Sequence, residues 1–344
     1  MRWSRTFTVV DCHAEGEVGK VVTGGVGDVP GGSVFEKRLH LERERDQLRK
    51  LLLFEPRGSV AQNANVIVPA SHPEAQLGYV ILEATEYPAM SGSNTICVAT
   101  VLLETGMLTM TEPVTELVLE APAGLIRVSC ECRDGKVVSV RFTNQPSFVY
   151  HAAATIDVDS VGPLVVDIAY GGMTYAIVRA EDIGLELVPS EARDLCILGQ
   201  QIKTAADEQL VAVHPDNPLI LGITQTEFTG PVRREQGELV ARNAVIVSPG
   251  RVDRSPCGTG TSARLAVMHA KGELAVGEDF VHESIIGTRF RSRIEHTATV
   301  GEYPAVVTSV AGQAWITGIN QVGLDPTDPF PDGYTLSDTW MQVP

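Results

Sequence analysis

The sequence predicts an α/β protein made of two similar halves. Short segments rich in Val, Ile, Leu and Thr recur through its 344 residues, and helical periodicity is confined to a few stretches. Two of those stretches match each other: a shift of 166 positions places Ser91 on Cys257 and preserves the glycine that follows each of them. Since the length also allows two domains of ordinary size, we expect one turn–helix unit in each half.

The match between the two units needs no gap. Each unit opens with a residue that carries a hydroxyl or a thiol, and each closes with Gly-x-Leu, a combination that chance does not readily supply. If the two halves face each other, Ser91 and Cys257 flank one cleft. The other aligned pairs are Gly92 and Gly258, Thr95 and Thr261, Val101 and Val267, Gly106 and Gly272, and Leu108 and Leu274.

The remaining elements follow from periodicity and from helix-breaking residues. Apolar residues at helical spacing predict helices over 35–54, 190–209 and 262–274, and a further helix that opens at Ser91. We place an N-terminal α/β domain at 1–130, completed by about 315–344, and a C-terminal α/β domain at 131–314. Runs rich in apolar and β-branched residues predict strands over 7–10, 18–23, 65–68, 77–83, 115–119, 137–143, 164–169, 219–225, 238–247 and 314–319.

Composition argues against several classes of function. The formal net charge of −16 is unfavourable for a nucleic-acid or anionic-membrane partner, because such partners require basic patches. No apolar run reaches the length of about twenty residues that a transmembrane helix needs. Six cysteines scattered over a chain of this length do not indicate a disulfide framework, so we expect a reduced, cytoplasmic protein.

Cys257 is the residue best placed for chemistry. It lies between Pro256 and Gly258, just before a predicted helix. Unpaired N–H groups at a helix start favour a thiolate and can also hold a carboxylate. The alternative is a buried cysteine that serves only as a small hydrophobic residue in front of a core helix.

Other catalytic signatures are largely missing. The sequence has no His-Glu-x-x-His pair and no phosphate-binding Gly-x-x-x-x-Gly-Lys motif, and Gly258-x-Gly260 lacks the third glycine of a dinucleotide loop. We therefore expect no metal and no cofactor, which leaves acid–base chemistry by side chains. His269 is expected to pack within its helix, and four other histidines are expected at the surface: His40, His72, His282 and His296.

At this point the motifs resemble a known family. The stretch from Asp253 to Thr261 is similar to the second catalytic motif of the proline racemase family, and Met90 to Thr95 is similar to the first. The segments 55–58 and 167–172 match further blocks of that family. The resemblance implies the diaminopimelate-epimerase-like fold, in which two pseudo-symmetric domains each curl a β-sheet around a central helix. It also implies catalysis without a cofactor, and homodimers are common for this fold.

The resemblance assigns roles to individual residues. Family racemases place a thiol on each side of Cα, but here the first position is Ser91, and a serine follows at 93 where the family has histidine. We expect Ser91 and Cys257 to be catalytic and Asp253 to accept from the ring ammonium. The remaining residues expected to bind substrate are Gly92, Ser93, Asn94, Gly258 and Thr259.

The serine decides which reaction we favour. An alkoxide is far less accessible than a thiolate near neutral pH, so a balanced two-thiol exchange is weakened. Ser-Gly-Ser-Asn-Thr is similar to the trans-3-hydroxy-L-proline dehydratase branch, and our leading hypothesis is that dehydratase, which makes pyrroline-2-carboxylate. The resemblance implies that Ser91 faces the Cα hydrogen of the L-substrate as proton acceptor and that Cys257 faces the opposite side as acid or base; the reverse orientation stays open. The alternatives are a 4-hydroxyproline 2-epimerase, alone or as a second activity, and a non-catalytic protein that binds proline-like amino acids.

Overall fold

The computed structural model describes residues 2–341 and divides the chain into two compact units. The first unit comprises residues 1–142 and 312–344, and the second comprises residues 143–311. The expected domain limit at 130/131 falls inside strand β6 (Gly124–Arg133). Because β6 pairs with β7 (Lys136–Thr143) in one antiparallel hairpin, the first unit extends to the end of that hairpin.

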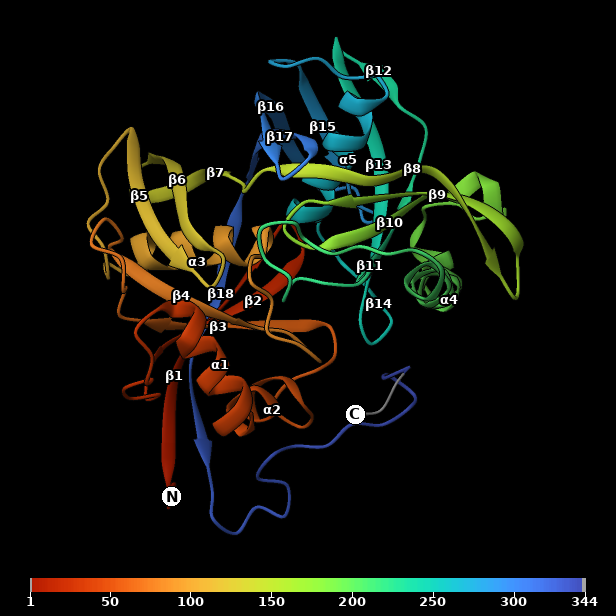
Figure 1. Ribbon diagram of the computed structural model, residues 1–344. Coiled ribbons are helices and arrows are strands. Elements are labelled where there is room, and N and C mark those ends of the chain that lie inside the picture. The colour runs from red at the N-terminus through yellow and green to blue at the C-terminus, as the bar shows by residue number, and fades with distance from the viewer. Residues whose placement is uncertain (1, 342–344) are drawn as a thin grey trace. The chain divides into compact units, whose positions relative to one another are not determined.

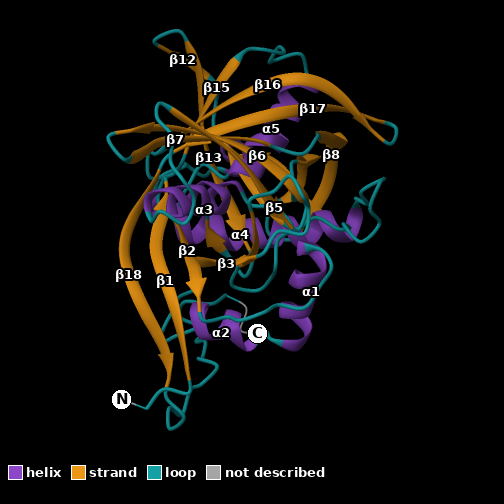
Figure 2. Ribbon diagram, turned by 90° about the vertical axis from the view of Figure 1, so that its left-hand side faces the viewer, coloured by secondary structure: helices purple, strands orange, loops and turns teal. Residues whose placement is uncertain are grey.

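The first unit is a single mixed sheet with helices on both faces (Figure 1). Its strand order is β18-β1-β2-β3-β4-β5-β6-β7, parallel at β2–β3 and β4–β5 and antiparallel elsewhere. The long strands β1 and β18 run side by side in Figure 2. The remaining bounds are β1 (Arg5–Ala14), β2 (Glu17–Gly24), β3 (Gln62–Val68), β4 (Leu77–Leu82), β5 (Val114–Ala121) and β18 (Ala314–Leu324).

Alternation along β3 and β4 decides which helix covers which face. Val66 and Val80 join the core beneath helices α1 (Val34–Glu44) and α2 (Gln47–Leu53). The neighbouring residues on these strands point the other way: Asn65 and Tyr79 hydrogen-bond to side chains of helix α3 (Gly92–Glu104). Because successive side chains of a strand lie on opposite faces, α3 occupies the face opposite to α1 and α2.

The single helix expected over 35–54 is a wrong prediction, because the chain leaves the helix at Arg45. The break allows the carboxylate of Asp46 to accept from Arg49 and from the hydroxyl of Tyr87. It also redirects the leucines of α2 into the core of the first unit.

The second unit closes its sheet into a ring. The strands follow the order β8-β9-β10-β11-β13-β15-β16-β17, and β17 pairs again with β8 through Ala305 and Phe148. Two short strands, β12 and β14, pair with β13. The bounds are β8 (Ser147–Val158), β9 (Gly162–Tyr170), β10 (Thr174–Arg179), β11 (Gln225–Thr229), β12 (Arg233–Glu235), β13 (Glu238–Val247), β14 (Arg251–Val252), β15 (Asp279–Glu283), β16 (Arg289–Val300) and β17 (Tyr303–Gly312).

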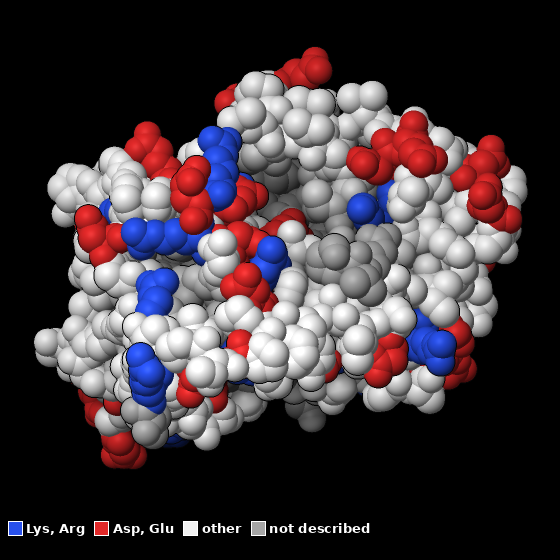
Figure 3. Space-filling model, turned by 90° about the horizontal axis from the view of Figure 1, so that it is seen from below, with Lys and Arg blue, Asp and Glu red and all other residues white. Residues whose placement is uncertain are grey.

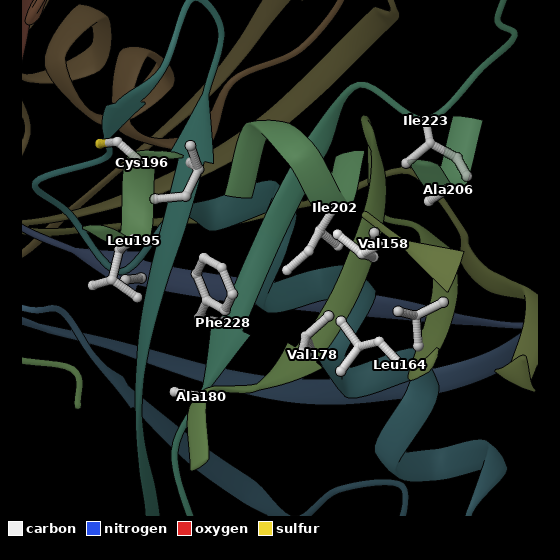
Figure 4. Packing of buried hydrophobic residues seen from close by; sticks show 14 of the residues in the cluster. Val158, Leu164, Val178, Ala180, Leu195, Cys196, Ile202, Ala206, Ile223 and Phe228 are labelled. Atoms are coloured by element: carbon white, nitrogen blue, oxygen red, sulfur yellow. The ribbon is translucent and has the colours of Figure 1, made fainter. Parts of the chain in front are cut away.

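Two helices cover opposite faces of this sheet as well. On β10, Ala176 and Val178 join the core that contains helix α4 (Ala192–Gln209), and Figure 4 shows Val178 and Phe228 among its side chains. The alternate residues Tyr175 and Ile177 pack instead with helix α5 (Gly258–Ala270). Two 3-10 turns, 180–183 and 189–191, precede α4.

The two units share one topology, which confirms the expected fold class. Strands β18, β1 and β2 correspond to β8, β9 and β10, and the same sequence of antiparallel and parallel pairings follows in both units. Helix α3 follows β4 as α5 follows β13 and β14, so the two matched sequence stretches occupy equivalent places.

One expected strand is wrong. Residues 219–224 contain no strand apart from an isolated bridge at Leu221, and the strand begins only at Gln225. Acidic and basic side chains are interspersed on the face shown in Figure 3. Within the described residues, no helix is both long enough and apolar enough to cross a membrane.

Candidate functional site

Cys257 is the N-cap residue of α5, and its backbone adopts a conformation that is rare for residues other than glycine. Its φ and ψ are 62° and 110°, in the region that favours glycine. This conformation turns the thiol back over the first turn of the helix, where Sγ accepts from the N–H of Gly260 at 3.4 Å. Strain at a non-glycine residue persists only where the surroundings hold it, and such residues cluster at functional sites.

Two hydroxyl groups complete the surroundings of the thiol. The hydroxyl of Tyr175 lies 3.4 Å from Sγ of Cys257, and Oγ1 of Thr259 lies 3.7 Å from it. These two hydroxyls are hydrogen-bonded to each other at 2.6 Å. We call Asp253, Tyr175 and residues 257–260 the Cys257 site.

Burial and charge both act on this thiol. Burial is the largest influence and raises the pKa of Cys257 well above its ordinary value, and the nearby carboxylate of Asp253 raises it further. The hydrogen bonds from Tyr175 and Gly260 oppose these effects by stabilising the thiolate. The buried thiol is therefore a strong base once it has lost its proton, and two donors, the N–H of Gly260 and the hydroxyl of Tyr175, are placed to hold it in that state.

Asp253 is buried and connected to Cys257 through Ser255. Its Oδ1 accepts from the backbone N–H and the hydroxyl of Ser255, at 2.8 and 2.9 Å. The Ser255 hydroxyl oxygen in turn accepts from the N–H of Cys257 at 3.1 Å. This chain fixes the turn that presents the thiol.

Ser91 has different surroundings at the N-cap of α3. Its hydroxyl makes no capping bond to the helix backbone and instead accepts from the side-chain amide of Asn94 at 2.9 Å. The oxygen of that amide accepts from Asn65 at 2.7 Å. Amide groups do not titrate, and among the described residues no carboxylate, imidazole or amine hydrogen-bonds to Ser91. We call Ser91, Asn94 and Asn65 the Ser91 site.

The other predicted binding residues begin the two helices. Gly92, Ser93 and Asn94 form the buried first turn of α3, and Gly258 and Thr259 begin α5. The amide of Asn94 is engaged with Ser91 and Asn65, so this residue positions the serine. The hydroxyl of Thr259 is likewise engaged with Tyr175.

A second polar group lies beneath the first turn of α5 and was missed by the sequence analysis. Glu227 and His282 are both fully buried, with Oε1 of Glu227 at 3.6 Å from Nε2 of His282. The other imidazole nitrogen, Nδ1, is 2.8 Å from the hydroxyl of Thr261. The expectation that His282 is a surface residue is therefore wrong.

Weak signals for these residues exist in the sequence. His282 lies two positions after Phe280 in a strand, which places both on one face. Tyr175 follows paired glycines and shares its strand face with Ile177. Neither pattern indicates which helix lies over that face, so only the folded chain connects them to Cys257.

Two other expectations concern cysteines and metals. All six cysteines are buried and free. Among residues 2–341, no group of three or more His, Cys, Asp or Glu side chains is arranged to hold a metal ion.

Comparison with known proteins agrees with the motifs at both helix starts. The sequence profile of the family described as proline racemase matches residues 9–335. A hydroxyproline epimerase from Agrobacterium vitis, solved with bound trans-4-hydroxy-L-proline, is 40% identical with a TM-score of 0.92, covering 99% of this chain and 98% of its own. A probable proline racemase from Agrobacterium radiobacter K84, with bound carbonate, is 39% identical with a TM-score of 0.91, covering 98% of both chains.

More distant structures share the fold alone. A phenazine biosynthesis protein of the PhzF family from Bacillus anthracis is 12% identical with a TM-score of 0.58, covering 92% of this chain and 99% of its own. At this identity, the likeness shows a common architecture and carries no information on the reaction.

Proposed function

The chain belongs to the proline racemase family, and from that premise we propose that it removes and returns the Cα proton of a hydroxyproline, as a 4-hydroxyproline 2-epimerase. The single observation that carries this proposal is the Cys257 thiol, held at the start of α5 by donors from Gly260 and Tyr175. The likeness to the hydroxyproline epimerase from Agrobacterium vitis supports the substrate class. It favours the epimerase over the dehydratase that led the sequence analysis.

In the proposed reaction, the Cys257 thiolate takes the Cα proton of the substrate. An S–H bond forms, the C–H bond breaks, and its electron pair moves into the carboxylate. Backbone N–H groups at the starts of α3 and α5 stabilise that charge as it develops. Asp253 accepts from the ring ammonium. The electron pair then returns from the carboxylate to Cα as the Ser91 hydroxyl gives a proton to the opposite face, which inverts the centre. Loss of the Cys257 proton to solvent and protonation of the Ser91 alkoxide restore the starting state.

Proton donation by Ser91 is the slower step of the proposed reaction. Donating its proton leaves an alkoxide, which one amide hydrogen bond from Asn94 stabilises only in part. No base among the described residues hydrogen-bonds to Ser91 to share the charge. We therefore propose that proton exchange on the Cys257 face is faster than inversion.

A second candidate function is favoured by this asymmetry. In trans-3-hydroxy-L-proline, the Cα hydrogen and the 3-hydroxyl lie on one ring face, so loss of water is a syn elimination. Cys257 alone could take the proton and return it to the departing hydroxyl group, with the hydroxyls of Tyr175 and Thr259 beside it. A trans-3-hydroxy-L-proline dehydratase would then need nothing from Ser91 except a hydrogen bond.

Product analysis separates the two reactions. The purified protein is incubated separately with trans-4-hydroxy-L-proline and trans-3-hydroxy-L-proline, and both are followed by proton NMR and by the colour that a cyclic imine gives with o-aminobenzaldehyde. Formation of cis-4-hydroxy-D-proline without imine supports the epimerase, and imine from the 3-hydroxy compound supports the dehydratase. Thermal stabilisation by both compounds without any product would contradict both and leave a binding protein.

A further inference from the structure

We propose that Glu227 is a positioning residue for Cys257. The two groups lie so close together that negative charges on both would repel each other strongly, so a thiolate forms more readily at Cys257 while Glu227 keeps its proton. The inference rests on the role proposed above for Cys257 as the base. The residues whose contacts support it, however, all belong to the second unit.

Gly260 shows how closely the two groups approach. A Cβ atom placed on Gly260 would lie 3.1 Å from Oε2 of Glu227 and 3.2 Å from Sγ of Cys257. The carboxyl oxygen and the sulfur therefore flank the space of one missing methyl group, and both residues are buried. Two negative charges at such a separation in a medium of low dielectric repel strongly.

Glu227 is held on the face of β11 that meets α5. Its neighbours Thr226 and Phe228 face α4 instead: Thr226 bonds to Gly199 of that helix, and Phe228 lies in the core that contains it. The alternation of the strand thus aims the carboxyl group toward the start of α5, behind the thiol.

The groups facing Glu227 come from four elements. Asn243 of β13 donates to Oε1 at 3.4 Å, and His282 of β15 lies 3.6 Å from the same oxygen. Arg264 of α5 and Tyr175 of β10 interact with Glu227 electrostatically. Oε2 has no hydrogen-bond partner among the described residues. A buried carboxylate oxygen without a donor is costly, whereas a protonated carboxyl group is tolerated there.

The electrostatics of the site agree with this arrangement. Burial raises the pKa of Glu227 to about 8, and the attraction of Arg264 only partly opposes it. Burial also lowers the pKa of His282 well below its ordinary value, with Arg264 acting in the same direction, so the imidazole is neutral. Near neutral pH, Glu227 therefore keeps its proton. When it ionises, it adds to burial and to the carboxylate of Asp253, the larger influences that raise the pKa of the Cys257 thiol.

Alkylation of Cys257 tests the inference without requiring turnover. Wild type and Glu227→Gln are treated with iodoacetamide over a range of pH, and modification of the peptide that carries Cys257 is followed by mass spectrometry. The expected result is that Glu227→Gln reacts severalfold faster above pH 8, because the repulsion that an ionised Glu227 adds to that of Asp253 is gone. Glu227→Asp keeps the charge and should restore the wild-type profile. Glu238→Gln removes one charge elsewhere in the second unit and should leave the profile unchanged.

Coincident profiles for wild type and Glu227→Gln would overturn the inference, even if the enzyme acts on hydroxyproline. If Glu227→Gln does not fold, the coupling can be measured from the side of Glu227 in a protein that keeps this residue. The infrared band of the protonated carboxyl group is titrated before and after alkylation of Cys257. Since coupling between two sites is reciprocal, the charged carboxymethyl group that iodoacetate leaves on Cys257 should hold the band to higher pH than the neutral group that iodoacetamide leaves there. An unshifted titration would contradict the proposal.

Discussion

The hydroxyl of Tyr175 lies 3.4 Å from the sulfur of Cys257 and 2.6 Å from the hydroxyl of Thr259. No comparable donor from a neighbouring strand reaches Ser91 among the described residues. Its hydroxyl accepts instead from the side-chain amide of Asn94, three residues further along the chain. One helix start thus surrounds a thiol with donors from the helix and from a neighbouring strand, and the other gives a hydroxyl group a single amide donor.

Tyr175→Phe should slow Cα proton exchange by about 10- to 100-fold. It removes one hydrogen bond to a charged acceptor, worth about 1.5–3 kcal/mol, and leaves the packing of the ring unchanged. The rate should also depend on a Cys257 titration displaced to higher pH. Tyr170→Phe, in the aromatic cluster with Phe148, is the control and should retain both the rate and its pH dependence.

Ser91→Cys should increase the rate of epimerisation, because it replaces an alcohol with a thiol whose anion is accessible in water. The measurement is the approach to equilibrium from trans-4-hydroxy-L-proline, followed by optical rotation. Ser91→Ala is the matched loss of function and should retain proton exchange on the Cys257 face alone. Equal epimerisation by Ser91→Ala and wild type would exclude the hydroxyl as the second proton donor.

Glu227 should make the protein less stable as the pH rises. Its pKa is raised from the ordinary 4.5 to about 8 in the folded state, so between these values the folded chain holds a proton that the unfolded chain has lost. Stability is therefore fully present below pH 4.5 and falls by at most about 1.4 kcal/mol per pH unit towards pH 8. Urea unfolding at pH 5.5 and 7.5 should show this loss in wild type and a smaller loss in Glu227→Gln.

Gly171→Ala should destabilise the protein by about 1–3 kcal/mol. Its Cβ would lie 2.2 Å from the carbonyl oxygen of Thr259 and 2.5 Å from the nitrogen of Ala263, both backbone atoms of α5 that cannot easily move. The control is Gly24→Ala, where the nearest atoms lie 3.6 Å away. Urea unfolding followed by circular dichroism should separate the two variants, and equal midpoints would contradict the close packing of α5 on this turn.

The duplicated fold could be predicted because repeated residues occupy repeated places. Ser91 and Cys257 aligned in the sequence, and both prove to be N-caps of helices that follow equivalent strands. Local patterns were less reliable where packing decides the outcome. Residues 35–54 contain no glycine or proline, so nothing in their spacing indicates that the chain leaves the helix at Arg45.

The surroundings of the thiol could not be predicted for a related reason. Tyr175, Glu227 and His282 lie on three different strands, and they meet α5 only through the register of a closed sheet. A single residue of slip would turn each side chain to the other face. The spacing of residues in the sequence identifies Cys257 as the reactive residue. The groups that determine whether its thiol is protonated are brought to it only by the fold.

The most direct test of the central claim is deuterium incorporation at Cα. Wild type and Cys257→Ala are incubated with trans-4-hydroxy-L-proline in deuterium oxide, and the Cα proton signal is followed by NMR. We predict that wild type exchanges this proton and forms cis-4-hydroxy-D-proline, and that Cys257→Ala does neither while remaining folded. Exchange at the wild-type rate in Cys257→Ala would contradict the assignment of Cys257 as the base.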